Sequence, residues 1–261
     1  MADPSQIKKA ALVTGAGRRL GLDMAQALAR DGWSVVFHAH SAIDVAEAAA
    51  KEVRGNGGEA VAVCADLSDP GALAPLVREA AQAFGPLTLL VNNAGVFVHD
   101  GIRSATAETM ATNLDINLIA PILLTQAFVA QFPEGAQGNV VNILDQRVAN
   151  LTPNYMSYTA SKVALAALTR TWALELAPSI RVNGIGPGMA LPEHGDNAAG
   201  MARWTDGYPV RRGTSPREIS DALRYILSAP GMTGQILHVD GGQSLGWLHP
   251  DGGYPLKPGQ V

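Results

Sequence analysis

Tyr158 and Lys162 are the residues of this chain whose types and spacing most directly suggest chemistry. They lie four positions apart in an alanine-rich apolar run, so on a helix they project from the same face. A lysine ammonium beside a phenol favours the phenolate and lowers the pKa of the tyrosine toward neutral pH. Tyr158 is therefore a candidate proton donor. Asp145 lies thirteen residues earlier and is a third candidate for the same site.

A glycine-rich segment near the N-terminus predicts a second site, for a dinucleotide. Residues 14–21 read Thr-Gly-Ala-Gly-Arg-Arg-Leu-Gly and follow an apolar run that is expected to form the first strand. Glycines between a strand and a helix let the backbone approach a pyrophosphate, which then meets the helix N-terminus. We expect contacts to the cofactor from Gly15, Gly17, Arg18, Arg19, Leu20 and Gly21.

The end of the second expected strand distinguishes between dinucleotides. An acidic residue there would bind the ribose 2′-hydroxyl of NAD. The sequence has His38-Ala39-His40-Ser41 at this point instead, and Arg18 and Arg19 lie in the glycine loop. Donor and cationic groups without a carboxylate suit a 2′-phosphate, so we predict NADPH/NADP+ as the cofactor, with His38, His40 and Ser41 at its phosphate. Alternatively, Arg18 is a solvated loop charge and His38 a strand-end residue bonded to backbone groups.

The elements that must position these residues alternate along the chain. Apolar runs predict strands at 10–14, 34–38, 60–64, 87–91, 140–144, 181–185 and 236–239. Helical patterns lie at 20–30, 42–54, 71–84, 108–131, 155–176 and 216–227. This alternation predicts an α/β fold, a Rossmann-type doubly wound parallel sheet of about seven strands with helices on both faces. We interpret residues 1–261 as a single domain, with an irregular substrate loop at 190–213 and a C-terminal tail at 243–261.

The composition narrows the function classes. Of the 261 residues, 47% are hydrophobic, the net charge is −4 and the pI is near 5.8. This balance argues against nucleic acid or an anionic membrane as a partner. Cys64 is the single cysteine, which excludes an intramolecular disulfide, and no histidine–carboxylate spacing predicts a metal site. Without a recognisable targeting segment or a long uninterrupted apolar run, we expect a soluble cytoplasmic protein.

Several motifs together resemble the short-chain dehydrogenase/reductase family. The resemblance covers residues 10–242 and rests on the glycine loop, Asp66, Asn92-Asn93-Ala94-Gly95, Asn117, Tyr158-x-x-x-Lys162 and Pro187-Gly188. Within the family, the chain is similar to pteridine reductases, which include bacterial dihydromonapterin and dihydrofolate reductases of the short-chain type. That similarity rests on Arg19 in place of a glycine, on Phe97, on Asp145 in place of a serine, and on His38-Ala39-His40. The chain departs from the subgroup at Ser41, where arginine is frequent, and at Trp247, near an arginine that in some members reaches a neighbour's active site.

The resemblance implies a role for each matching residue. Tyr158 would donate the proton, and Lys162 would bind the nicotinamide ribose and polarise Tyr158. Asn117 would hold the water that links Lys162 to solvent; alternatively, it is a polar residue at a helix kink near Pro121. Asp66 would contact the adenine. The other expected cofactor contacts are Leu67, Asn93, Ala94, Gly95, Pro187 and Gly188, although Asn93 also suits a simple turn.

Asp145 in place of serine favours a C=N substrate over a carbonyl. Carbonyl reduction builds negative charge on oxygen, which neutral donors stabilise and an ionised carboxylate repels. An imine nitrogen must instead be protonated, so a carboxylate stabilises its cationic form. Phe97 agrees with this interpretation, because an aromatic ring could stack a flat heterocycle. We therefore expect a pterin-like substrate, of the dihydropterin or dihydrofolate type, contacted by Phe97, Asp145, Tyr158 and Met189.

Two alternative functions stay open. Asp145 could cap a loop or be a tolerated change in an NADP-dependent short-chain alcohol or carbonyl oxidoreductase. A non-catalytic NADP-binding regulatory protein is the second alternative, which the presence of Asn117, Tyr158 and Lys162 disfavours. His99, Asp100 and His194 lie in loops around the expected pocket, where they could contact substrate or, more simply, face solvent.

The helices expected at 108–131 and 155–176 are apolar over more than one face, which is more than a single sheet contact requires. They could pack against their symmetry mates, and the family resemblance implies the same arrangement. We therefore expect a homotetramer with closed symmetry.

Overall fold

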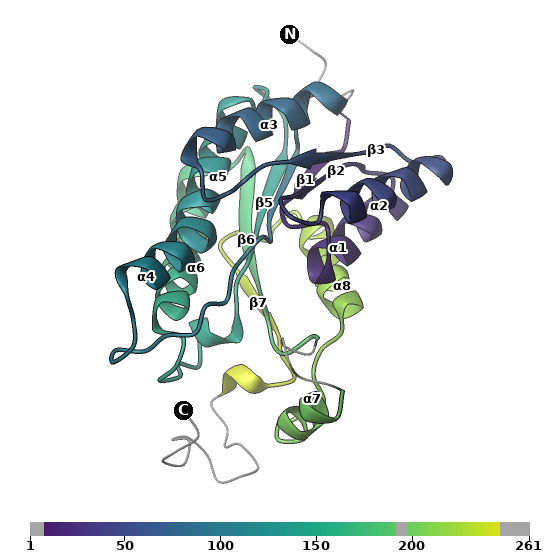
Figure 1. Cartoon of the computed structure of the whole chain (residues 1–261). Helices are drawn as coiled ribbons and strands as arrows, with labels where there is room; N and C mark the ends of the chain where they lie inside the picture. Colours follow the sequence, from purple (N-terminus) through teal and green to yellow (C-terminus); the bar gives the residue numbers. More distant parts are fainter. Residues whose placement is uncertain (1–7, 192–197, 246–261) are drawn as a thin grey trace.

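A computed structural model of the protein describes residues 8–191 and 198–245 (Figure 1). Seven parallel strands form one sheet in the order β3-β2-β1-β4-β5-β6-β7. They are β1 (Ala10–Val13), β2 (Ser34–Ala39), β3 (Ala60–Cys64), β4 (Leu89–Asn92), β5 (Gly138–Ile143), β6 (Ile180–Pro187) and β7 (Ile236–Val239). The predicted α/β fold class is confirmed.

Helices cover both faces of the sheet (Figure 1). On one face lie α1 (Arg19–Arg30), α2 (Ile43–Gly55) and α8 (Pro216–Ser228). On the other lie α3 (Pro70–Phe84), α4 (Ala107–Leu114), α5 (Ala120–Ala130) and α6 (Met156–Leu176). Successive residues of β1 alternate between two cores. Ala11 and Val13 lie in the first core, on the side of α1, α2 and α8, and Ala10 and Leu12 lie in the second core, on the side of α3, α5 and α6. Because both faces of β1 are buried, all four of its residues are apolar.

The strand order reverses beside β1. The chain runs from β1 outward through β2 to β3 and then returns to form β4 on the other side of β1. In open parallel sheets, ligands bind outside the carboxyl ends of the strands at this point of reversal. The glycine loop follows β1 there, and Asn93, Ala94 and Gly95 follow β4.

The helix expected at 108–131 is interrupted by a π-helical turn, η2 (Asp115–Ile119), between α4 and α5. Pro121 follows directly and lies in the first turn of α5, where its missing N–H is tolerated. The whole run Ala107–Ala130, with a mean hydropathy of 1.4, is long and apolar enough to cross a membrane. Leu124 and Phe128 pack in the core against the sheet, so we interpret the run as a core helix.

The segment 190–213 differs from the prediction. It was expected to be irregular, but its described part contains the helix α7 (Ala198–Thr205). The predicted strand 87–91 begins late, at Leu89, because the side chain of Gln131 bonds both the N–H and the carbonyl of Leu87. In the tail, residues 243–245 form a 3₁₀ turn, η4 (Gln243–Leu245). Trp247 and His194 lie outside the described residues.

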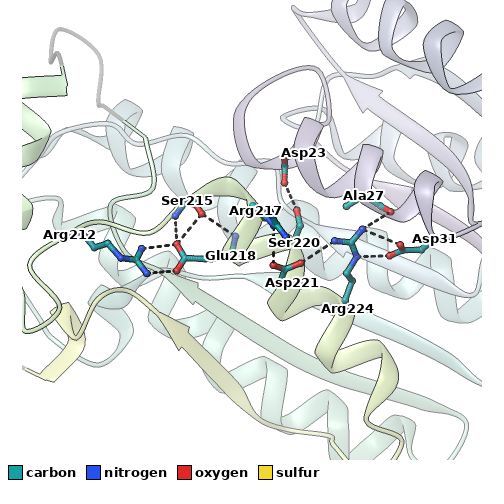
Figure 2. A network of polar contacts seen from close by, with 10 residues as sticks. All are labelled: Asp23, Ala27, Asp31, Arg212, Ser215, Arg217, Glu218, Ser220, Asp221 and Arg224. Carbon is teal, nitrogen blue, oxygen red and sulfur yellow. Dashed lines mark hydrogen bonds and ion pairs between the residues drawn. The ribbon is translucent and has the colours of Figure 1, made fainter.

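Polar contacts join α1 to α8 on the outer side of the first core (Figure 2). Ser220 Oγ donates to Asp23 at 2.5 Å, and Arg224 Nε donates to Asp31 at 2.6 Å. This network fixes the last helix before β7 against the helix that begins in the glycine loop. It therefore joins two helices that are far apart in the sequence within one layer of the fold.

Candidate active site

The glycine loop is tied to the end of β4 by Thr14. Thr14 Oγ1 accepts from the backbone N–H groups of Asn93 at 2.9 Å and Ala94 at 3.0 Å. Asn93 Nδ2 returns a bond to the Thr14 carbonyl at 2.8 Å. These contacts hold the two loops of the strand-order reversal side by side.

Two glycines are required by the shape of this loop. Gly15 has φ +65°, a left-handed conformation that side chains disfavour. A Cβ on Gly21 would collide with the Gly15 carbonyl and with Asn93 Nδ2. The start of α1 therefore lies close against the loop, in which Gly15 is half-buried and Gly17 is buried. Leu20, half-buried beside it, packs against the first core.

His38 does not lie as a 2′-phosphate contact would. It is 2% exposed; its Nδ1 accepts from Gly15 N–H at 3.2 Å and its Nε2 lies 3.1 Å from the Ala65 carbonyl. Burial lowers the pKa of His38 below its ordinary value, which agrees with a neutral ring. The geometry matches the alternative interpretation, a strand-end histidine bonded to backbone groups. His38 thus anchors the glycine loop to β2 and β3.

The neighbouring polar residues are accessible. Arg18, Arg19, His40 and Ser41 are all exposed at the ends of β1 and β2. Arg19 adopts φ +53°, a left-handed conformation at the first position of α1. Gly17 packs closely against Ala42, because a Cβ on Gly17 would lie 2.8 Å from the carbonyl oxygen of Ala42.

Asp66 and Leu67 follow the carboxyl end of β3 and border the expected cofactor site. Asp66 Oδ1 accepts from Ser68 Oγ at 2.7 Å and from Ser68 N–H at 2.8 Å, and these bonds lower the pKa of the Asp66 carboxyl. Leu67 is buried against the second core. The carboxylate is thereby oriented by the turn that it caps.

Tyr158, from the first turns of α6, meets Asp145 at the end of β5. The Tyr158 hydroxyl donates to Asp145 Oδ2 at 3.0 Å. The other carboxylate oxygen, Oδ1, accepts from Arg147 N–H at 2.8 Å and lies 3.4 Å from Arg147 Nη1. Asp145 precedes a short 3₁₀ turn, η3 (Gln146–Val148), and caps it. It is therefore both a turn cap and a partner of the tyrosine hydroxyl.

Lys162 lies one helical turn after Tyr158 and is 4% exposed. Its Nζ donates to the Ile143 carbonyl at 2.8 Å and lies 5.8 Å from the centre of the Tyr158 ring. Burial lowers the pKa of Lys162 from 10.5 to about 8, while the nearby Asp145 carboxylate opposes that change. Lys162, Tyr158 and Asp145 thus lie close together, in what we call the catalytic corner of the candidate site.

Asn117 lies inside the π-helical turn and is fully buried. Its side-chain oxygen accepts from Val96 N–H and its Nδ2 donates to the Val96 carbonyl, both at 2.9 Å. A Cβ on Gly95 would lie 3.0 Å from Asn117 Oδ1 and 3.8 Å from Lys162 Nζ. Asn117 therefore fixes the loop after β4 in front of the lysine.

Aromatic residues build the wall beside this corner. Phe97 is 37% exposed and stacks on Tyr155, with ring centroids 3.9 Å apart. It also meets the Tyr158 ring edge to face at 4.6 Å. The sequence analysis did not identify Tyr155 or Arg147, although their positions between Asp145 and Tyr158 are a signal that could have found them.

Of the two loop residues after Phe97 that were expected to contact substrate or face solvent, His99 is exposed and Asp100 is buried. His99 is exposed and meets Tyr155 edge to face at 4.8 Å. Asp100 was expected to contact substrate or face solvent, and both interpretations were wrong, because it is 1% exposed. Its carboxylate accepts from Ser157 N–H at 3.1 Å and Ser157 Oγ at 2.5 Å, at the N-terminus of α6.

Residues after β6 complete the edge of the site. Gly188 N–H donates to the Val239 carbonyl at 3.0 Å, and a Cβ on Gly188 would lie 2.7 Å from Asp240 Cα. Pro187 is the last residue of β6 and Met189 is half-buried. Within residues 8–191 and 198–245, no cluster of three or more histidine, cysteine, aspartate or glutamate side chains could hold a metal ion.

Comparison with known proteins gives consistent results. Residues 9–200 match the family described as short chain dehydrogenase. An uncharacterised oxidoreductase of Methylorubrum extorquens is 36% identical over 243 residues, which cover 90% of this chain and 97% of that protein. A 3-oxoacyl-(acyl-carrier-protein) reductase of Synechocystis sp. is 31% identical over 238 residues, covering 89% and 95% respectively.

A similar solved structure is that of the alternative dihydrofolate reductase 1, FolM, from Brucella suis in complex with NADP. It is 38% identical in sequence and superimposes with a TM-score of 0.89. The match covers 93% of this chain and 98% of that chain.

Proposed function

The chain belongs to the short-chain dehydrogenase family, and from this premise we propose that it is an NADPH-dependent reductase that delivers hydride to a C=N bond of a pterin-like substrate. The substrate would be of the dihydropterin or dihydrofolate type. The observation that carries the proposal is the bond of 3.0 Å between the Tyr158 hydroxyl and Asp145 Oδ2. It puts a carboxylate at the proton donor, where reduction of a carbonyl would require a neutral group.

The residues after β1 and β2 fit the cofactor. The tight glycine turn between β1 and α1, with exposed Arg18 and Arg19 at the start of the helix, suits a pyrophosphate at the N-terminus of α1. Exposed Arg18, His40 and Ser41 offer a 2′-phosphate a cation and two hydrogen-bonding groups. The structure of the Brucella suis protein, solved with NADP, supports the same cofactor. When bound, NADPH supplies the hydride.

The proposed proton transfer uses Tyr158, Lys162 and Asp145. Tyr158 gives its hydroxyl proton to the substrate nitrogen, and the Lys162 ammonium stabilises the phenolate that remains. Asp145 would stabilise the positive charge that develops on the nitrogen as it takes this proton, until hydride addition to the adjacent carbon neutralises it. Asn117 holds the loop after β4 through Val96, which positions Gly95 beside Lys162.

Phe97 would receive the substrate. Its ring stacks on Tyr155, meets Tyr158 edge to face and is partly exposed, so a flat heterocycle could pack against the exposed part of the ring. Met189, half-buried after β6, would form the opposite contact. We further propose a homotetramer that functions in the cytoplasm.

A carbonyl reductase is the second candidate function. The identity of 31% to a protein named as a 3-oxoacyl-(acyl-carrier-protein) reductase favours it, because that name specifies a ketone substrate. A non-catalytic NADP-binding protein has no comparable support, since Tyr158, Lys162 and Asn117 are all present and gathered at one corner.

Oxidation of NADPH should be measured with dihydrobiopterin, dihydromonapterin, dihydrofolate and a panel of small ketones. We expect Asp145→Ser to lower pterin reduction by about tenfold or more, about 1.4 kcal/mol of transition-state stabilisation. The same change should spare or raise ketone reduction, because serine is a neutral donor for an oxyanion. Tyr158→Phe should lower ketone reduction by about 100-fold or more and pterin reduction by less, since Asp145 and water could share the proton delivery.

The ketone substrates are the internal control for folding in this experiment. If Asp145→Ser lowers both activities in parallel, or changes neither, Asp145 acts only as the cap of η3. A wild-type enzyme that reduces ketones and no pterin would establish the second candidate function instead.

A further inference from the structure

Arg147 lies beside Asp145 and has none of the roles proposed above. Its N–H and Nη1 approach Asp145 Oδ1 at 2.8 and 3.4 Å. The other carboxylate oxygen, Oδ2, accepts from the Tyr158 hydroxyl at 3.0 Å. Asp145 therefore uses one oxygen for Arg147 and the other for the proton donor.

The guanidinium of Arg147 is confined by its neighbours. The side chain is 15% exposed, and Nε lies 3.4 Å from Thr152 Oγ1. Its central carbon is 5.1 Å from the ring centroids of both Phe97 and Tyr155, which are stacked 3.9 Å apart. A point equally far from two stacked rings lies beside the stack, so the guanidinium closes the edge of the aromatic pair and stays next to the carboxylate.

The charge of Arg147 matters because Asp145 creates an electrostatic cost. Once Tyr158 has lost its proton, a phenolate and a carboxylate lie at hydrogen-bond distance and repel one another. Lys162 is a second cation at this corner, but burial lowers its pKa to about 8, so part of it is neutral in weakly alkaline solution. A guanidinium stays charged throughout this range. A neutral serine in place of Asp145 would not create the cost.

We infer that Arg147 is a positioning residue that compensates the charge of Asp145, so that this carboxylate can serve a cationic substrate nitrogen without suppressing ionisation of Tyr158. The inference deepens the proposed function and rests on its assignment of Tyr158 as the proton donor. The other titratable groups around the corner are Lys162 on α6, exposed His99 beside Tyr155, buried Asp100 at the N-terminus of α6, and His238 on β7.

A double-mutant cycle between Asp145→Ser and Arg147→Met tests the inference, because methionine keeps the length of the side chain and its apolar contacts. With NADPH and the best substrate, Arg147→Met should lower kcat near neutral pH by about tenfold and move the pH–kcat profile upward by about one pH unit. In the Asp145→Ser background the same change should alter kcat by less than about twofold. Arg147→Lys, which keeps a cation, should restore most of the rate. Equal damage by Arg147→Met in both backgrounds would assign Arg147 to packing and overturn the inference.

A second measurement requires no turnover. Ionisation of Tyr158 is followed by tyrosinate absorbance, as the difference between each variant and its Tyr158→Phe counterpart. The midpoint should rise by about one pH unit in Arg147→Met and return in the double variant. An unchanged midpoint in Arg147→Met would overturn the inference even if the protein reduces pterins. A protein that reduces only ketones would contradict the proposed substrate and leave this test intact.

Arg224→Met is the matched control, because it also removes an arginine from a pair with an aspartate. Arg224 Nε lies 2.6 Å from Asp31 in the network between α8 and α1 (Figure 2). It should leave both the pH–kcat profile and the Tyr158 midpoint unchanged. A shift as large as that of Arg147→Met would show a general loss of stability and count against the inference.

Discussion

At the scale of single residues, burial of the Lys162 ammonium lowers the stability of the folded protein. Its ammonium is buried and has a carbonyl, Ile143 O, as its hydrogen-bond acceptor. The lowering of its pKa from 10.5 to about 8 means that keeping the buried lysine charged at neutral pH costs the folded state about 3 kcal/mol. The fold tolerates this cost at a position where the proposed mechanism requires a cation beside Tyr158, and perturbed pKa values of this kind are frequent at catalytic sites.

Lys162→Met should therefore stabilise the protein while abolishing reductase activity. The expected gain is about 1 to 2 kcal/mol near neutral pH, because loss of the bond to Ile143 O offsets part of the desolvation cost. Between pH 8 and 10.5 the unfolded wild-type chain binds more protons than the folded one, so wild-type stability should rise with pH in this window. The variant should show no such rise.

Urea unfolding across this pH range, at a fixed protein concentration, measures both effects. Lys51→Met, an exposed lysine on α2, is the matched control and should change stability by less than about 0.5 kcal/mol. A destabilised Lys162→Met variant would show that the bond to Ile143 outweighs desolvation.

The sequence analysis assigned Tyr158 and Asp145 to the same candidate site, and the structure joins them by a hydrogen bond of 3.0 Å. The sequence did not predict the place of Arg147, since the direction of a guanidinium depends on the 3₁₀ turn after β5, which has no periodic signal. The prediction for His38 named the right strand end. However, only the structure shows that its ring turns toward Gly15 and Ala65 instead of toward a ligand.

At the scale of elements, α6 carries both Tyr158 and Lys162, and its start is fixed by Asp100. The buried carboxylate accepts two bonds from Ser157, and the Asp100 carbonyl accepts from Tyr155 N–H at 2.7 Å. Tyr155 has φ +60° and offers no side-chain cap to the helix. The positive end of the helix dipole stabilises the Asp100 charge.

Asp100→Asn should consequently lower stability by about 1 to 2 kcal/mol and lower kcat more than it weakens NADPH binding. The reason is that the amide keeps an acceptor for Ser157 N–H but loses the charge that orients the first turn of α6. Thermal unfolding and fluorescence titration with NADPH measure the two effects. Asp44→Asn, an exposed aspartate in the first turn of α2, is the control and should cost less than about 0.5 kcal/mol. Equal costs for the two changes would contradict the role of Asp100.

The regular elements were largely predictable, because buried strands and amphipathic helices have clear periods. The exceptions are elements that depend on tertiary contacts. The π-helical turn at Asp115–Ile119 accommodates the bonds between Asn117 and Val96, and α7 lies where glycine and proline suggested irregular structure. In both places the local sequence is compatible with more than one backbone, and distant residues decide between them.

At the scale of the whole molecule, the sheet gathers groups that are far apart in the sequence. The carboxyl ends of β1, β4, β5 and β6 bring the glycine loop, Gly95, Asp145 and Gly188 to one edge of the fold (Figure 1). Parallel pairing alone makes this outcome predictable, which is why the fold class and the general position of the site followed from the strand pattern. The substrate did not follow, since it depends on single side chains at that edge.

The outer face of the layer formed by α4, α5 and α6 carries the last prediction, a homotetramer. Exposed residues of α6 recur every three to four positions and include Val163, 39% exposed, and Leu174, 85% exposed. Met110 and Ile119, 40% and 38% exposed, lie on the neighbouring α4 and η2. An apolar face of this kind is expected to be covered by a second copy of the chain.

Val163→Glu should shift the assembly toward dimers or monomers in light scattering at micromolar concentration. In an isologous contact each residue occurs twice, so one substitution removes two buried valines, each contributing about 1.5 to 3 kcal/mol, and adds two charges. Val45→Glu is the matched control, because Val45 is a 50% exposed valine on α2, on the opposite face of the sheet. It should leave the assembly unchanged. A monomeric wild-type chain, or a Val163→Glu variant that assembles like wild type, would contradict the tetramer and leave the apolar face of α6 without the proposed partner.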